Sequence, residues 1–230
     1  MGKGQSAGID TDQYTQSDKG HSIRWNRPHR AACATLLLAH GAGAAMDSPF
    51  MQAMAERLAV RGVAVGRFEF PYMAERRANG RRRPPDAQAR LLQTWREIHA
   101  WVRQQATGPL AIGGKSMGGR MASLLADELD ADALVCLGYP FHPAGRLDKP
   151  RVEHLATLRT PTLIVQGERD ALGARETVAG YALASAIALH WLAAADHDLK
   201  PLKRSGLSHD QHLDEAADTV AAFLRRLPIR

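Results

Sequence analysis

The chain of 230 residues is 45% hydrophobic and 23% charged, a composition that fits one globular domain with a full-sized core. No apolar run reaches the roughly 18 residues of a membrane-spanning helix, and the polar start of the chain lacks the apolar core of a secretory signal. The formal net charge is +6, and two cysteines are too few for a disulfide framework, so we expect a reducing, cytoplasmic setting and no membrane partner.

The start of the chain is polar, and we predict that residues 1–20 form a disordered leader ahead of a single domain at residues 21–230. A weak alternation at residues 21–26 indicates an edge strand. Beyond it, apolar runs of the length of buried strands recur at residues 34–39, 63–70, 110–112, 133–138, 162–166 and 188–192. Stretches with helical spacing of apolar residues separate most of these runs, and two more helices are expected at residues 174–184 and from residue 208 to the end.

Apolar strands that alternate with helices indicate an α/β fold with a mostly parallel central sheet and helices on both faces. The connections between these elements are short, which leaves little or no room for a cap domain. Only the segments at about residues 72–85 and 139–150 are long enough to cover a site.

The stretch LAIGGKSMGGRMASLLA at residues 110–126 passes from a strand pattern to a helical one through a G-x-S-x-G motif centred on Ser116. In a nucleophile elbow the serine occupies a strained strand-to-helix turn, and small residues two positions away on either side avoid a collision. A five-residue motif also occurs by chance, and a glycine-rich turn can simply pack a helix against a sheet. The catalytic interpretation therefore depends on the rest of the chain.

Ligands of parallel sheets bind beyond the carboxyl ends of the strands. Ser116 follows the third strong strand, Asp170 follows the fifth and His197 follows the last. Nucleophile, acid and histidine occur in this order in α/β hydrolases. The sequence therefore predicts the α/β-hydrolase fold, with these residues as a catalytic triad.

The chemistry of acyl transfer explains the three residue types. A serine hydroxyl is a poor nucleophile at neutral pH, so His197 would take its proton, and Asp170 would hold the imidazole in the required tautomer. The oxyanion of the tetrahedral intermediate needs hydrogen-bond donors. We expect the amide of Met117 and a second amide from the small-residue loop HGAGA, that of Ala42 or Gly43.

Alternatives exist for two members of the triad. Glu168 could replace Asp170 as the acid, although Asp170 stands further out in its loop. His40 is expected to shape the HGAGA loop rather than to act as the base. A metal site built from residues 197, 198, 209 and 212 lacks a firm ligand spacing, and we predict neither a metal nor a cofactor.

Basic residues cluster after the second strong strand, with arginines at positions 76, 77, 81, 82 and 83. Such a cluster can attract an anionic substrate or nucleic acid, or can be an ordinary solvated loop. Because it follows the carboxyl end of a strand, we expect it beside the site, with Arg81 and Arg82 as substrate-binding candidates. Further candidates for substrate contact flank the same strand ends: His40, Tyr72 and Lys115. For Lys115, a simpler explanation of a charged residue beside the serine is that the elbow is exposed to solvent.

Several segments together resemble one family: LLLAHGAGAAMDSPFM, RFEFPYM followed by RR and RRRPP, GGKSMGGRMAS, GERD and DHDLKP. They are similar to small α/β-fold hydrolases that include a testis-expressed protein and a domain of a nuclear histone acetyltransferase complex subunit, and more distantly to dienelactone hydrolases. The resemblance runs from about Ala34 to the C-terminus. It implies the α/β-hydrolase fold and carries the triad onto Ser116, Asp170 and His197. It implies no substrate, and some eukaryotic relatives are regarded as interaction domains.

These observations predict a serine hydrolase that cleaves a small ester or thioester through an acyl-enzyme intermediate. If the arginine cluster takes part in substrate binding, the expected substrate is anionic. Two other functions stay open: a non-catalytic interaction module on a hydrolase fold, and anion or nucleic-acid binding by the arginine cluster. A small acyl substrate is the expected partner. Nucleic acid is less expected, because no binding motif accompanies the arginines, and the sequence predicts no particular oligomeric state.

Overall fold

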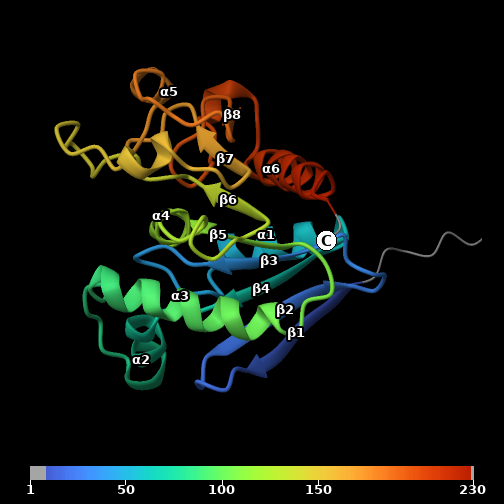
Figure 1. Cartoon of the computed structure of the whole chain (residues 1–230). Helices are drawn as coiled ribbons and strands as arrows, with labels where there is room; N and C mark the ends of the chain where they lie inside the picture. Colours follow the sequence, from blue (N-terminus) through green and yellow to red (C-terminus); the bar gives the residue numbers. More distant parts are fainter. Residues whose placement is uncertain (1–8, 229–230) are drawn as a thin grey trace, which may run out of the picture.

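An eight-stranded sheet forms the centre of the computed structural model, which describes residues 9–228 (Figure 1). The strands are β1 Ile9–Gln16, β2 Ser22–Pro28, β3 Ala34–Ala39, β4 Val63–Phe68, β5 Leu110–Lys115, β6 Ala133–Leu137, β7 Thr162–Gly167 and β8 Ile187–Leu192. Their order in the sheet is β1-β2-β4-β3-β5-β6-β7-β8. The strands β3 to β8 run parallel, and β1 and β2 add an antiparallel edge beside β4.

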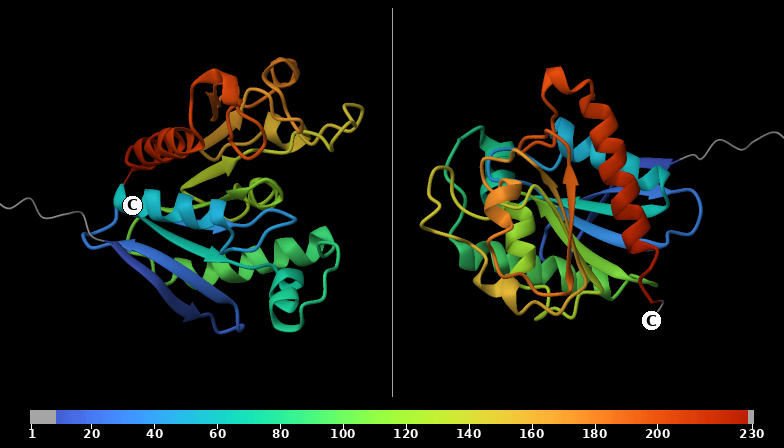
Figure 2. Two further views of the ribbon diagram at one scale, coloured as in Figure 1. Left: turned by 180° about the vertical axis from the view of Figure 1, so that it is seen from behind. Right: turned by 90° about the horizontal axis from the view of Figure 1, so that it is seen from above.

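Helices cover both faces of this sheet (Figure 2). They are α1 Pro49–Val60, α2 Pro71–Asn79, α3 Gln88–Arg103, α4 Met117–Ser123, α5 Arg175–Val178 and α6 His209–Leu224. Alternate residues of β3 point to opposite faces: Leu36 and Leu38 pack with α1 and α6, whereas Leu37 and Ala39 pack with α3 and α4. The predicted α/β fold with a mostly parallel sheet is therefore confirmed. Within the described residues, every helix is too short or too polar to span a membrane.

The predicted leader at residues 1–20 is wrong in part, because β1 occupies Ile9–Gln16 and lengthens the sheet by one strand. This strand is polar, so its apolar pattern is too weak to be recognised in the sequence. It is held by the backbone ladder to β2, by a 2.8 Å hydrogen bond from Trp25 Nε1 to Thr15 Oγ1, and by Arg24 stacked over Tyr14. Residues 1–8 of the predicted leader lie outside the described residues.

Two connections differ from the prediction. The arginine-rich segment expected as a loop begins with α2, in which Pro71 occupies the first turn and Gly80 ends the helix with a φ of 72°. The helix expected at residues 174–184 is a single turn, α5. It ends where the amide of Gly180 bonds to the carbonyl of Thr177, because glycine disfavours continuation of a helix.

Candidate active site

Ser116 stands in the turn between β5 and α4 with a φ of 51° and a ψ of −116°, a strained conformation for a residue with a side chain. The glycines on either side make this turn possible. A Cβ on Gly114 would lie 2.6 Å from the carbonyl oxygen of Ala39, and one on Gly118 would lie 2.4 Å from the same atom. Both positions therefore require glycine, and the turn holds Ser116 at the carboxyl end of the sheet.

His197 and Asp170 form a hydrogen-bonded chain with this serine. His197 Nε2 lies 2.9 Å from Ser116 Oγ, and Nδ1 lies 2.7 Å from Asp170 Oδ2. Because an ionised carboxylate only accepts hydrogen bonds, Nδ1 carries the proton and Nε2 is free to accept from the serine. Asp170 is fully buried, whereas the His197 side chain is 27% exposed. The structure thus brings together the three residues that the sequence predicts.

Gln166 is a site residue that the sequence analysis missed. It lies fully buried in β7, where its Nε2 donates to Asp170 Oδ2 over 2.8 Å and its Oε1 accepts from the amide of Tyr139 over 2.7 Å. The amide of Leu172 donates to Asp170 Oδ1 over 2.8 Å. The aspartate is therefore fixed by two donors besides the histidine. The signal in the sequence is one amide side chain in a mostly apolar strand, because a buried amide needs hydrogen-bond partners.

Glu168, the alternative acid, makes different contacts. Its Oε2 accepts from the amide of Ala194 over 3.0 Å, and its Oε1 pairs with Arg175 over 2.7 Å. It therefore braces the segment after β8 and does not contact the histidine.

Lys115 is buried beside the elbow, so the exposure that the sequence favours for it is wrong. Its contact with substrate stays a prediction. Its side chain is 9% exposed, and Nζ donates to the carbonyl of His197 over 2.7 Å and pairs with Asp198 over 3.3 Å. Burial lowers the pKa of this ammonium group, and the neighbouring carboxylates, first of all Asp198, oppose that shift. Gly138 leaves room for the contact, since a Cβ there would lie 2.8 Å from the His197 carbonyl oxygen. Lys115 thus connects the elbow to the segment after β8 that carries His197.

His40 is fully buried below the HGAGA loop and positions that loop rather than the substrate. Its Nδ1 lies 2.7 Å from the carbonyl oxygen of Gly41, and its Nε2 accepts from the amide of Phe70 over 3.1 Å. Burial lowers the pKa of His40, which favours the neutral ring that these bonds require. The prediction that His40 contacts substrate is wrong, because both ring nitrogens are occupied by backbone.

Tyr72 supports the same loop from α2. The phenol is buried and donates to the carbonyl of Ala42 over 2.8 Å, and burial raises its pKa. Its predicted role in substrate binding is therefore replaced by support of the loop. Beside the loop lies a cavity of about 300 Å³, lined by Gly43, Ala44, Ala45, Asp47, Met73, Arg76 and Arg77.

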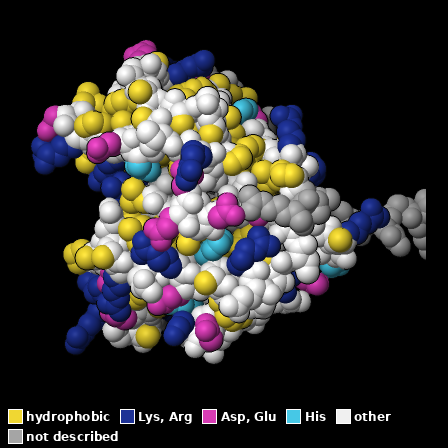
Figure 3. Space-filling view, viewed as in Figure 1, with side chains coloured by type: hydrophobic (Ala, Val, Ile, Leu, Met, Phe, Trp, Pro, Cys, Tyr) yellow, Lys and Arg dark blue, Asp and Glu magenta, His cyan; other side chains and the backbone are white. Residues whose placement is uncertain are grey.

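The arginine cluster is partly neutralised by acidic neighbours. Arg77 forms a two-point contact with Glu69 and pairs with Asp47, and Arg83 pairs with Glu75 and Asp86. Figure 3 shows basic and acidic side chains intermixed on the side of the molecule that carries α2.

Arg81 and Arg82 lie on the exposed connection after α2. In the described part of the chain, no hydrogen bond or ion pair joins them to the triad. Their proposed contact with substrate therefore stays a prediction.

The histidines considered for a metal site bond to backbone instead. His209 Nε2 lies 2.9 Å from the carbonyl oxygen of Asp198, and His212, which is buried, places Nδ1 3.0 Å from that of Leu199. Within residues 9–228, no group of three or more histidine, cysteine or carboxylate side chains is arranged to hold a metal ion.

The fold and the serine–histidine–aspartate geometry together define an α/β hydrolase. The sequence model of the alpha/beta hydrolase domain matches residues 32–225, and the chain belongs to that family. The predicted α/β-hydrolase fold is therefore confirmed.

Solved structures support the same class. The chain is similar to dienelactone hydrolase from Anabaena variabilis, with a TM-score of 0.71 and 19% identity over 98% of this chain and 100% of that chain. It is also similar to an alpha-beta serine hydrolase homologue from Coxiella burnetii, with a TM-score of 0.69 and 18% identity over 95% of this chain and 99% of that chain. A serine hydrolase without lid from Xanthomonas campestris has a TM-score of 0.66 and 19% identity over 97% of this chain and 96% of that chain. At these identities the likeness shows a shared fold.

Proposed function

We propose that the protein is a serine hydrolase that cleaves a small ester or thioester through an acyl-enzyme intermediate. The observation that carries the proposal is the continuous chain of hydrogen bonds from Asp170 through His197 to Ser116, built on a strained elbow. A glycine-rich turn that served packing alone would not require a buried carboxylate and a histidine aligned on its serine.

In the proposed mechanism, His197 Nε2 takes the proton of Ser116 Oγ as the hydroxyl attacks the carbonyl carbon of the ester. Asp170 stabilises the imidazolium that results. The same imidazolium then protonates the leaving alcohol or thiol. A water molecule, activated by His197, releases the acid and restores the serine.

The oxyanion hole of this mechanism consists of the amides of Met117 and Ala42. Met117 is the first residue of α4, so its amide has no partner within the helix. Gly41 packs against Ser116, since a Cβ on Gly41 would lie 3.6 Å from Ser116 Cβ. Its carbonyl is held by His40, and in a trans peptide the following amide, that of Ala42, points away from that carbonyl. This arrangement supports Ala42 over Gly43.

An open site supports a small or extended substrate. The partial exposure of His197 leaves the triad accessible, and the similar Xanthomonas campestris serine hydrolase is described as lacking a lid. The cavity of about 300 Å³ beside the HGAGA loop offers room for one arm of the substrate. The ion pairs of Arg77 and Arg83 lower the positive potential available to a nucleic acid and support a small-molecule partner. We also propose a cytoplasmic location, which the free thiols of Cys33 and Cys136 support.

The test is hydrolysis of 4-nitrophenyl acetate and butyrate, followed from the first turnover. We expect a burst of one 4-nitrophenol per protein chain in the wild type and none in Ser116→Ala. Asp170→Asn should lower turnover by about 10⁴-fold, because the imidazole loses its required tautomer. Glu168→Gln, which changes a neighbouring acid outside the triad, is the matched control and should keep the wild-type burst. Equal turnover by the wild type and Ser116→Ala would refute the proposed function.

A further inference from the structure

Two arginines on segments beside the elbow have no acidic partner among the described residues. Arg120 lies one helical turn after Ser116, and its amide donates to the serine carbonyl over 3.0 Å. Arg151 follows the long segment after β6, and its amide donates to the carbonyl of Phe141 over 2.7 Å. Among the residues that the structure describes, no Asp or Glu forms an ion pair with either guanidinium, in contrast to Arg77.

A network of three buried or half-buried side chains brings these arginines together. Ser123 Oγ donates to the carbonyl of Arg120 over 2.8 Å and lies 2.8 Å from His154 Nε2. The Tyr139 hydroxyl lies 3.5 Å from the same nitrogen and donates to the carbonyl of Arg151 over 2.9 Å. The backbone positions of Arg120 and Arg151 are thus fixed relative to each other by a short chain of hydrogen bonds.

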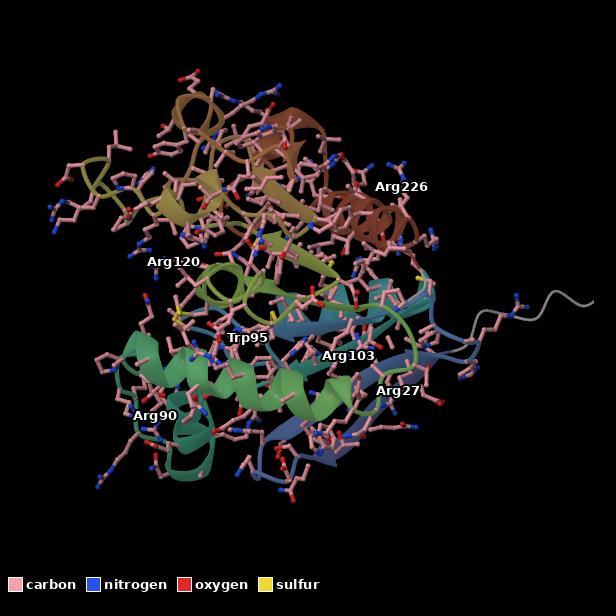
Figure 4. All side chains as sticks on the ribbon, in the orientation of Figure 1. Arg27, Arg90, Trp95, Arg103, Arg120 and Arg226 are labelled. Carbon is pink, nitrogen blue, oxygen red and sulfur yellow. The ribbon has the colours of Figure 1, made fainter. Side chains whose placement is uncertain are left out.

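The Arg120 side chain and the backbone of Arg151 lie at the end of the sheet that carries the triad. Side chains of a helix lean toward its N-terminus, which for Arg120 is the end where Ser116 stands. Its Nη2 reaches Gln88 Oε1 over 3.4 Å, at the first residue of α3, and α3 begins at this same end. Figure 4 shows Arg120 on the side of the molecule where α3 begins. Arg151 is anchored to Phe141, which follows the carboxyl end of β6.

Among the described residues, no negative charge pairs with the two guanidinium groups. Arg120 Nε is buried, and no group in residues 9–228 accepts a hydrogen bond from it. Burial lowers the pKa of Arg151, and the charge of Arg120 lowers it further. His154 contributes no third charge near neutral pH, because burial, with the field of Arg120, lowers its pKa to about 4. Two like charges in a partly desolvated place, with unused donors, are stabilised by an anion that accepts from both.

We propose that Arg120 and Arg151 form a binding site for a negatively charged oxygen group of the substrate, a carboxylate or a phosphate, next to the nucleophile. The inference rests on the proposed function and names the substrate class: an ester whose acyl or alcohol part carries an acidic group. The proposed anion site lies at α4 and at the segment after β6, and not at the arginine cluster after β4 where the sequence places it.

The first test compares 4-nitrophenyl monoesters of succinate, glutarate and adipate with the methyl esters of the same acids, and Ser116→Ala corrects for self-hydrolysis. We expect the wild type to prefer the free acids. In Arg120→Gln and Arg151→Gln, the ratio of kcat/KM for free acid over methyl ester should fall about ten- to a hundredfold, as for the loss of a charge-assisted contact. An unchanged ratio in both variants, or no wild-type preference at any chain length, would overturn the proposal.

Arg226→Gln is the control for net charge, because Arg226 is exposed and lies on the opposite side of the molecule from Arg120 (Figure 4). It should keep the wild-type ratio. Arg120→Lys and Arg151→Lys keep the charge and guard against misfolding of the glutamine variants. The lysine variants should retain part of the preference for the free acid over the methyl ester. If a lysine variant shows no more preference than the glutamine variant at the same position, recognition by charge is contradicted.

A second measurement separates this inference from the proposed hydrolysis. The melting temperature of Ser116→Ala is recorded with glutarate and with inorganic phosphate, and again after adding Arg151→Gln. A rise that disappears with Arg151→Gln supports the anion site even if no ester is cleaved, and the more effective ligand distinguishes carboxylate from phosphate. Ester hydrolysis without any such rise would overturn the anion site alone.

Discussion

At the scale of single residues, the triad depends on polar side chains that enter the protein interior. Lys115 holds the carbonyl of His197, and Gln166 holds the carboxylate of Asp170. The first contact joins the end of β5 to the segment after β8, and the second fixes the segment after β7. The three catalytic groups, which come from separate loops, are thus fixed relative to one another. Small displacements of such groups carry large costs in rate.

Lys115→Met tests this role. The methionine keeps the unbranched shape and most of the length of the side chain but removes the donor to His197, so we expect kcat/KM to fall roughly 10- to 100-fold while the fold is kept. Asp198→Asn is the matched control: it weakens an ion pair to a carboxylate that is 71% exposed and leaves the lysine donor in place, so its effect should be small. Equal losses in the two variants would show that the ion pair, and not the bond to His197, matters.

His154 gives the stability of the protein a defined pH dependence. Burial lowers its pKa to about 4, whereas a histidine in the unfolded chain titrates near 6.5. The unfolded chain therefore takes up the proton first as the pH falls. The contribution of the neutral ring is complete above about pH 6.5 and is lost as the pH drops toward 4. We expect His154→Gln to lose less stability than the wild type between pH 7 and pH 5 in urea unfolding, and parallel losses would contradict the assignment.

At the scale of elements, the turn between β5 and α4 is set by its glycines. Gly118→Ala would push a methyl group against the carbonyl oxygens of Ala39 and His40, so we expect a loss of stability of about 1–3 kcal/mol or more and a disturbed Ser116. Gly108→Ala, in open space before β5, is the control and should be tolerated. Thermal unfolding and the rate of ester hydrolysis measure both effects. A Gly118→Ala variant with wild-type values would show that the turn is looser than its contacts indicate.

Sequence patterns predicted these elements where the apolar signal was strong. The parallel strands β3 to β7 are buried along almost their whole length, so each is a short apolar run that stands out from its surroundings. The edge strand β8 is only partly buried, but it is also a short, mostly apolar run. The polar strand β1 was missed because its stability comes from pairing with β2 rather than from burial. The helix after β7 was predicted too long because tertiary packing and Gly180 end it after one turn.

At the scale of the whole molecule, the positive net charge acts over a distance, whereas the pair Arg120 and Arg151 acts by contact. Arg81→Gln with Arg82→Gln should lower kcat/KM for an acidic ester several-fold at about 10 mM salt, where the Debye length is about 30 Å, and should have no effect near 1 M. The loss caused by Arg151→Gln should persist at both salt concentrations. If the loss in Arg81→Gln with Arg82→Gln persisted at high salt and the loss in Arg151→Gln disappeared, the anion would bind at the arginine cluster instead.

The candidate site could be predicted in part from sequence. The order of serine, aspartate and histidine along the chain, and their positions after predicted strands, were sufficient to predict the triad. Parallel strands bring their carboxyl ends to one edge of the sheet, which brings Ser116, Asp170 and His197 together. The residues around them were not predictable in this way. His40, Tyr72 and Lys115 all flank the site, but burial directs their polar atoms at backbone carbonyls, and this depends on packing that no local pattern records.

The central claim is that Ser116 is an activated nucleophile, and the most direct measurement is labelling with a fluorophosphonate probe followed by intact mass. The wild type should gain the mass of one probe, Ser116→Ala should gain none, and His197→Gln should react far more slowly because the serine loses its base. A folded wild-type protein that stays unlabelled, or a Ser116→Ala variant that is labelled as fast as the wild type, would contradict the account.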